Sequence, residues 1–141
     1  MIATSTSSVA TLDNQTATIA VASGYQCTID GSLAIDTTSG TYGELVVDCD
    51  TLDFGGTLVV HLSGPNDGEC DELVVNGILD LDSGSELDPP IDGDTSNSNG
   101  YTYTVISASG GIENSFSYVY PINNEHWRET TDTFVEIYGY G

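Results

Sequence analysis

The stretch GELVVD at residues 43–48 recurs as DELVVN at residues 71–76, a spacing of 28 residues. Both copies alternate apolar and polar side chains, which is typical of β-strands that bury one face. Around them, other short alternating segments are separated by Gly, Asp or Asn, residues that favour turns. This arrangement predicts coils in which each strand pairs in parallel with its equivalent one coil further on.

The chain beyond residue 100 differs in character, because it holds nine of the 12 aromatic residues. An open end of stacked coils exposes apolar core and unpaired strand edges, which bulky aromatic side chains could cover. We therefore predict an all-β fold: a right-handed parallel β-solenoid of about four coils over residues 1–94, closed by an aromatic-rich C-terminal β cap over residues 95–141. The aromatic residues expected to matter in the cap, and the only strong base of the chain, are Tyr101, Tyr103, Phe116, Tyr118, Trp127 and Arg128.

Three motifs support this prediction through a resemblance: GTLVVHLSG at 56–64, CDELVVNG at 70–77 and YTYTVISASGGIENSF at 101–116. Their succession resembles the C-terminal end of bacterial autotransporter passengers and of related secreted β-helix proteins. In that family a G-G-T-L-x-V-x-L rung and a D-x-L-x-V-x-G rung precede a Y-T-V-I-x-A-x-G-G-I-x-G-x-F cap strand. The resemblance implies a β-helix that serves mostly as a non-catalytic scaffold.

The charge of the chain excludes several classes of partner. Its 141 residues hold 22 Asp and Glu against a single Lys or Arg, giving a formal net charge of −21. Such a surface repels the phosphates of nucleic acids and the anionic leaflet of a membrane. No apolar run approaches the roughly 20 residues that span a bilayer as a helix. We therefore expect no nucleic-acid binding and no membrane insertion, and the lysine-free acidic composition favours an extracellular or cell-surface location.

Some of the acidic side chains are arranged like calcium ligands. The segment DGDTSNSNG at residues 92–100 places oxygen donors at alternate positions, as calcium-binding loops do. Parallel stacking would also pile like charges about 4.8 Å apart along one face of a sheet. We expect calcium as the candidate cofactor, with the ligands Asp80, Asp82, Asp92, Asp94 and Ser96. The alternative is an acidic surface that water and salt solvate.

The three cysteines lie 22 and 21 residues apart, at Cys27, Cys49 and Cys70. If they stack on neighbouring coils, their Cα atoms come within the range that a disulfide allows. An odd number leaves at least one thiol free or paired with another chain. Both interpretations stay open: disulfide partners, or reduced cysteines that pack as small core residues.

No catalytic function is expected from the sequence. Lyases of the β-helix type remove a proton with a basic residue, and Arg128 is the only strong base of this chain. Hydrolases use paired carboxylates, but pairs such as Asp80 and Asp82 arise by chance in so acidic a chain.

We instead expect a structural protein, a self-assembling fibre or surface-scaffold subunit that forms homo-oligomers or filaments with the help of calcium. An uncapped end leaves backbone hydrogen-bonding groups that a second subunit can complete. Two alternatives remain. One is an adhesin, a module that binds a glycan or receptor at a cell surface through exposed tyrosines. The other is a carbohydrate-active β-helix enzyme.

Overall fold

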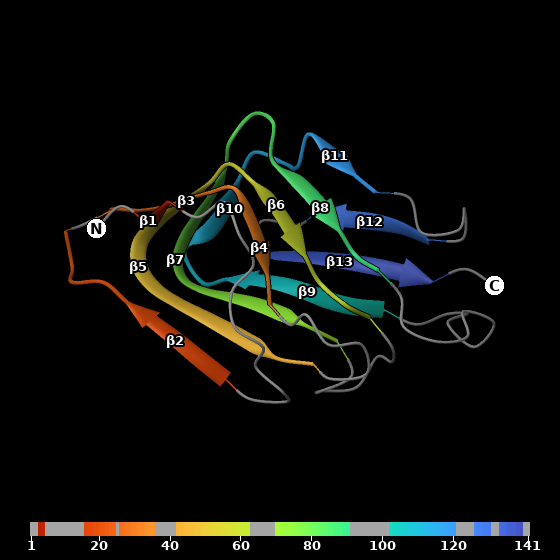
Figure 1. Cartoon of the computed structure of the whole chain (residues 1–141), viewed down its shortest axis with the longest axis horizontal. Coiled ribbons are helices and arrows are strands. Elements are labelled where there is room, and N and C mark those ends of the chain that lie inside the picture. Colours follow the sequence, from red (N-terminus) through yellow and green to blue (C-terminus); the bar gives the residue numbers. More distant parts are fainter. Residues whose placement is uncertain are drawn as a thin grey trace.

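The alternating segments form β-strands in the computed structural model, which describes residues 3–4, 16–24, 26–35, 42–62, 70–90, 102–120, 126–130 and 133–139 (Figure 1). Within these ranges, the side chains of residues 3–4, 102, 126–130 and 136–139 are not described. Among the described residues there is no helix long and apolar enough to cross a membrane. The strands are β1 (Ala3–Thr4), β2 (Thr16–Ala20), β3 (Gln26–Asp30), β4 (Ser32–Ala34), β5 (Glu44–Phe54), β6 (Thr57–Val59), β7 (Glu72–Leu81), β8 (Glu86–Asp88), β9 (Thr102–Ala108), β10 (Gly111–Glu113), β11 (Tyr118–Val119), β12 (His126–Thr130) and β13 (Phe134–Gly139).

The larger of two sheets has nine strands, and the long strands β5 and β7 lie at its centre (Figure 1). Seven strands follow the order β1-β3-β5-β7-β9-β13-β12, while β2 pairs with β5 and β10 pairs with β7. All pairs are parallel except β9 with β13 and β13 with β12, which are antiparallel. The sheet is therefore mixed.

The smaller sheet has four strands in the order β11-β8-β6-β4, and all of its pairs are parallel. Its equivalent positions lie in register: Ser32 pairs with Thr57, Thr57 with Glu86, and Glu86 with Tyr118. Side chains in register share one face of a sheet, because successive residues of a strand point to opposite faces. These four polar positions thus form one row across the small sheet.

The core lies between the two sheets and is built from the alternate apolar positions of their strands. Leu52 and Leu79 contribute from the large sheet, and Leu58 and Leu87 contribute from the small one; all four are fully buried. Their polar neighbours along each strand face outward, which is the alternation that the sequence shows. Burial of this set is the main force that holds the sheets together.

The predicted right-handed parallel β-solenoid of about four coils with a separate cap is wrong. The strands form two sheets, one mixed and one parallel, and the strands on either side of residue 94 belong to the same large sheet, since β7 pairs with β9. Alternation identifies strands and their inward faces but leaves the partner and its direction open. A connection of only a few residues between β12 and β13 produces an antiparallel pair, whereas a parallel pair needs a longer crossover.

One predicted pairing is confirmed. The two copies of the repeat lie side by side in parallel, with Glu44 paired with Glu72 and Val47 with Val75. The spacing of 28 residues found in the sequence is therefore the register of β5 against β7. The repeat predicts this contact because both copies bury the same alternate positions, Leu45 with Leu73 and Val47 with Val75.

Candidate functional site

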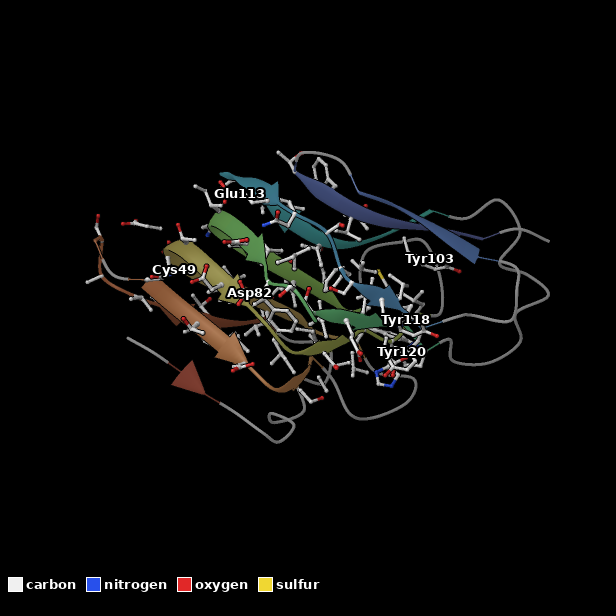
Figure 2. All side chains as sticks on the ribbon, turned by 90° about the horizontal axis from the view of Figure 1, so that it is seen from above. Cys49, Asp82, Tyr103, Glu113, Tyr118 and Tyr120 are labelled. Carbon is white, nitrogen blue, oxygen red and sulfur yellow. The ribbon has the colours of Figure 1, made fainter. Side chains whose placement is uncertain are left out.

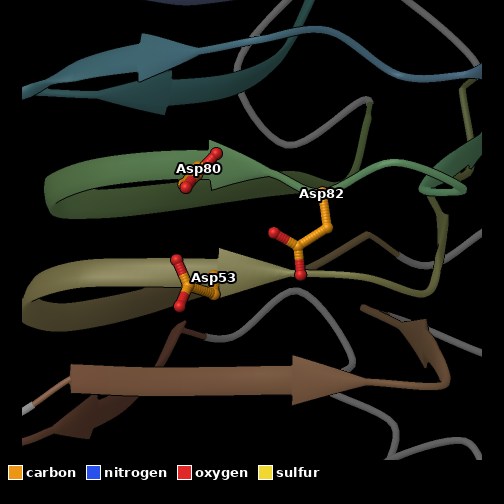
Figure 3. Close-up of side chains that lie close together, drawn as sticks. All are labelled: Asp53, Asp80 and Asp82. Carbon is orange, nitrogen blue, oxygen red and sulfur yellow. The ribbon is translucent and has the colours of Figure 1, made fainter.

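Three carboxylates meet on the outward face of the large sheet. Asp53 of β5 pairs in register with Asp80 of β7, and Asp82 follows directly after β7. One oxygen from each of the three side chains lies within 4.8 Å of the others. Figure 3 shows Asp53 and Asp80 one above the other, with the Asp82 carboxylate directed into the space beside them. We call Asp53, Asp80 and Asp82 the acidic cluster.

A β-bulge brings Asp53 and Asp80 into register. Before the bulge the paired residues are 28 apart, as in Asp48 with Asn76, and after it they are 27 apart, as in Thr51 with Ile78. Two residues of β5, Cys49 and Asp50, thus lie opposite a single glycine of β7, Gly77. A Cβ on Gly77 would lie 1.9 Å from the Cys49 carbonyl oxygen, and its φ is +154°, so only glycine fits there.

The column of like charges extends one strand further. Glu113 of β10 pairs in register with Asp80, so that three acidic residues follow one another on neighbouring strands. Figure 2 labels Glu113 and Asp82 on this part of the molecule. Like charges in directly opposed positions of a sheet destabilise it, so this column requires compensation.

The compensation that the structure shows comes from side-chain amides. The Gln26 amide nitrogen donates a hydrogen bond to Asp53 Oδ2. The Asn114 amide nitrogen donates to Asp80 Oδ1 at 2.8 Å, and Asn114 has the left-handed φ of 65° that asparagine tolerates well. Amide dipoles neutralise only part of a negative charge, and the whole chain has no lysine to complete the task.

The charges are felt most at Asp53. Partial burial raises the pKa of its carboxyl group, and the nearby Asp82, Asp80 and Glu113 raise it further. A raised pKa means that the folded protein favours the protonated acid, or any cation that can take the proton's place. The arrangement can therefore bind either a proton or a positively charged ion.

Beside the acidic cluster lies an open depression with a volume of about 380 Å³. Its wall is partly ordered by Asp50, whose Oδ2 accepts a 2.7 Å hydrogen bond from the Gly24 N–H. Carboxylate and amide oxygens around an open, wet space are suited to a hard cation such as calcium, which takes oxygen ligands and retains some water. The depression is lined by Gly24, Gln26, Asp50, Thr51, Asp53 and Asp80.

Of the five predicted calcium ligands, the structure brings two together, Asp80 and Asp82. Asp92, Asp94 and Ser96 lie outside the described residues. The sequence prediction missed Asp53, which is the partner of Asp80 across the strands. The spacing of 28 aligns Asp53 with position 81 rather than 80, so the signal was present in the repeat but displaced by the bulge.

The structure contains all three cysteines as free thiols, with Cys27 and Cys49 buried and Cys70 half-buried. Burial and a side-chain hydrogen bond with Cys27 raise the pKa of Cys49 to about 12. Cys27 pairs across the strands with Leu52 rather than with another cysteine, so the three residues do not form one register column. In this structure Cys27 and Cys49 pack as core residues.

The predicted aromatic residues divide between core and surface. Tyr103 and Phe116 are buried, whereas Tyr118 is exposed (Figure 2). Tyr101 lies outside the described residues, and Trp127 and Arg128 belong to β12 but have side chains outside the described part. Tyr120 and Phe134, which were not among the predicted site residues, are also exposed.

Comparison of the chain with protein-family models, with curated proteins and with solved structures found no match. The resemblance to autotransporter passengers therefore remains a prediction from the sequence.

Proposed function

We propose that this chain is a non-catalytic extracellular structural protein that assembles with copies of itself through an open edge of its large sheet. The supporting observation is strand β2, which pairs with β5 on one side and with no strand of the described residues on the other. Its sequence, TATIA, has no charged residue and no proline, and Ile19 is exposed. Natural edge strands normally carry such blocking residues, because an open edge pairs readily with another chain.

The backbone direction of β2 shows which groups a second copy would pair with. The Val21 N–H donates a 2.8 Å hydrogen bond to the Asp48 carbonyl and so points toward β5. Successive N–H groups of a strand point alternately to its two sides. We therefore expect the N–H of Thr18, three residues earlier, to point to the open side.

Charge opposes this association, since each copy carries a formal charge of −21. At physiological ionic strength the Debye length is about 8 Å, so salt weakens the repulsion between copies. Calcium bound at the acidic cluster would reduce it further by neutralising carboxylates on each copy. The proposed assembly is therefore favoured by salt and by calcium.

The test is negative-stain electron microscopy with sedimentation velocity on the purified chain, in calcium and again in chelator. We expect filaments or large homo-oligomers in calcium and smaller species in chelator. Thr18→Pro removes the outward N–H and should leave the chain monomeric, whereas the control Thr18→Ala keeps that N–H and should still assemble. A monomeric wild-type chain in both conditions, or unimpaired assembly of Thr18→Pro, would overturn the proposal.

A further inference from the structure

The exposed tyrosines of the small sheet form a pair at its edge. β11 is an edge strand, and Tyr118 and Tyr120 on it are two residues apart, with 50% and 40% of their surfaces exposed. Val119, between them, packs against the core, so both rings are held on the outward face. Large aromatic side chains at an exposed edge are unusual in a soluble chain and point to contact with a ligand.

The two rings are fixed relative to each other. Their centroids are 5.0 Å apart and their planes meet at 89°, an edge-to-face arrangement (Figure 2). The face of an aromatic ring carries partial negative charge, which attracts the weakly positive C–H groups on the flat side of a pyranose ring. A perpendicular pair offers such a ligand a corner rather than a single flat surface.

A carboxylate is held next to the rings. Glu86 Oε2 accepts a 2.9 Å hydrogen bond from the Tyr120 hydroxyl and a 3.2 Å hydrogen bond from Thr57 Oγ1. These two donors orient the carboxylate group, and sugar hydroxyls are good donors to carboxylates. Ser32 continues the row beyond Thr57, so hydroxyl and carboxylate groups follow one another across the strands at about 4.8 Å intervals.

The charge of the surface selects among carbohydrates. Glu86 and Asp88 both belong to β8, beside the tyrosine pair, and the chain has only one Lys or Arg in all. Sulfated, phosphorylated or uronic acid polymers would be repelled, whereas a neutral sugar can use the carboxylate as an acceptor. We propose that Tyr118, Tyr120 and Glu86 form a binding site for a neutral polysaccharide chain that runs across the small sheet.

This site lies on the small sheet, whereas the proposed self-assembly uses β2 of the large sheet, so each can fail without the other. Binding is measured on the Thr18→Pro variant as well as on the wild-type chain, which separates binding from assembly. Isothermal titration calorimetry uses cellohexaose, maltohexaose and chitohexaose as neutral probes and oligogalacturonate as the anionic probe.

We expect at least one neutral hexasaccharide to bind and oligogalacturonate not to bind. Tyr118→Ala should weaken binding about tenfold or more, because it removes one ring of the corner. Glu86→Gln should weaken it by a smaller factor, while Phe134→Ala, an exposed aromatic of the large sheet, is the control and should leave it unchanged. Circular dichroism confirms that each variant is folded.

Three results would overturn the proposal. The first is no binding of any neutral hexasaccharide at millimolar concentration. The second is binding that Tyr118→Ala and Tyr120→Ala both leave unchanged. The third is preferential binding of the anionic probe.

Discussion

The Gly43 N–H donates a 2.9 Å hydrogen bond to Oδ1 of Asp71, a fully buried carboxylate 28 residues further along the chain. The two residues occupy the same position in the two copies of the repeat, immediately before β5 and β7. The other oxygen, Asp71 Oδ2, accepts from the backbone N–H of His61 at 2.9 Å and from His61 Nδ1 at 3.3 Å. One buried side chain thus joins the starts of β5 and β7 to the segment that follows β6.

We predict that Asp71→Asn destabilises the fold by about 1–3 kcal/mol, the usual effect of leaving a buried polar group without a partner. An amide has one acceptor oxygen, so its NH₂ group would face either the Gly43 N–H or the two donors of His61. Burial raises the pKa of Asp71 and these hydrogen bonds lower it, so removal of the charge offsets part of the loss.

Urea unfolding measures the effect of Asp71→Asn, with Asp48→Asn as the control. Asp48 is exposed and pairs with Asn76, so its substitution should change the free energy of unfolding by less than about 0.5 kcal/mol. An Asp71→Asn variant as stable as the wild type would show that the three hydrogen bonds contribute nothing.

The acidic cluster predicts a dependence of stability on pH. Because the pKa of Asp53 is raised above its ordinary value of 3.8 in the folded protein, the folded state holds this proton more tightly than the unfolded state does. The resulting stabilisation is fully present below pH 3.8 and is lost as pH rises through the raised pKa. At neutral pH the ionised Asp53 therefore destabilises the fold.

Asp53→Asn should accordingly increase the free energy of unfolding at pH 7, by about 0.2–1 kcal/mol for relief of one like-charge cross-strand contact. The gain should shrink as pH falls toward 4, where the wild-type Asp53 is itself protonated. Thermal unfolding at a series of pH values, in chelator and at low salt, measures this. A loss of stability at pH 7 would contradict the electrostatic account and assign Asp53 a structural role instead.

Adjacent glycines predict opposite outcomes for the same substitution. A Cβ on Gly56 would lie 1.4 Å from the Gly31 carbonyl oxygen of the neighbouring strand connection, a backbone atom that has little freedom to move. A Cβ on Gly55 would meet only the carboxylate ends of Asp30 and Asp82, at 3.2 and 3.3 Å, and these side chains can turn away.

We predict that Gly56→Ala costs about 4 kcal/mol or more, or prevents folding, whereas Gly55→Ala stays within about 1 kcal/mol of the wild type. Both variants add one methyl group, so the difference between their denaturation midpoints isolates the backbone contact. Equal effects of the two substitutions would mean that Gly31 and Gly56 are not packed as closely as the structure has them.

The parts of this structure that were predictable are those that local pattern determines. The inward positions of β5 and β7 follow from alternation, and their register follows from the repeat. The antiparallel direction of β13 against β9 has no such signal, because an alternating strand buries the same face in either direction. Direction depends on the connections between strands, and their composition does not specify it.

The candidate site shows the same limit at the scale of one residue. Asp80 and Asp82 were recognised as neighbours in sequence, but Asp53 reaches them only through the bulge at Cys49 and Asp50. An extra residue in one strand shifts every later pair by one position. A repeat of 28 residues cannot reveal that shift, although Gly77 opposite the bulge is a residue type that allows it.

The bulge also predicts how the cysteines react. Burial, together with a hydrogen bond from Cys27, raises the pKa of Cys49 to about 12 from the ordinary 9.0. Three pKa units correspond to about a thousandfold less thiolate at pH 8, and the thiolate is the reactive form. Cys70 is half-buried, while Cys27 and Cys49 are buried, so a thiol reagent should modify Cys70 first.

We therefore expect one thiol per chain to react promptly with Ellman's reagent at pH 8, and all three to react in denaturant. Cys70→Ser should remove the prompt reaction, and Cys49→Ser should leave it intact. Prompt reaction of two thiols in the folded wild type would mean that the region around β3 and β5 opens readily. In that case Cys49 would be exposed often enough for its raised pKa to give little protection.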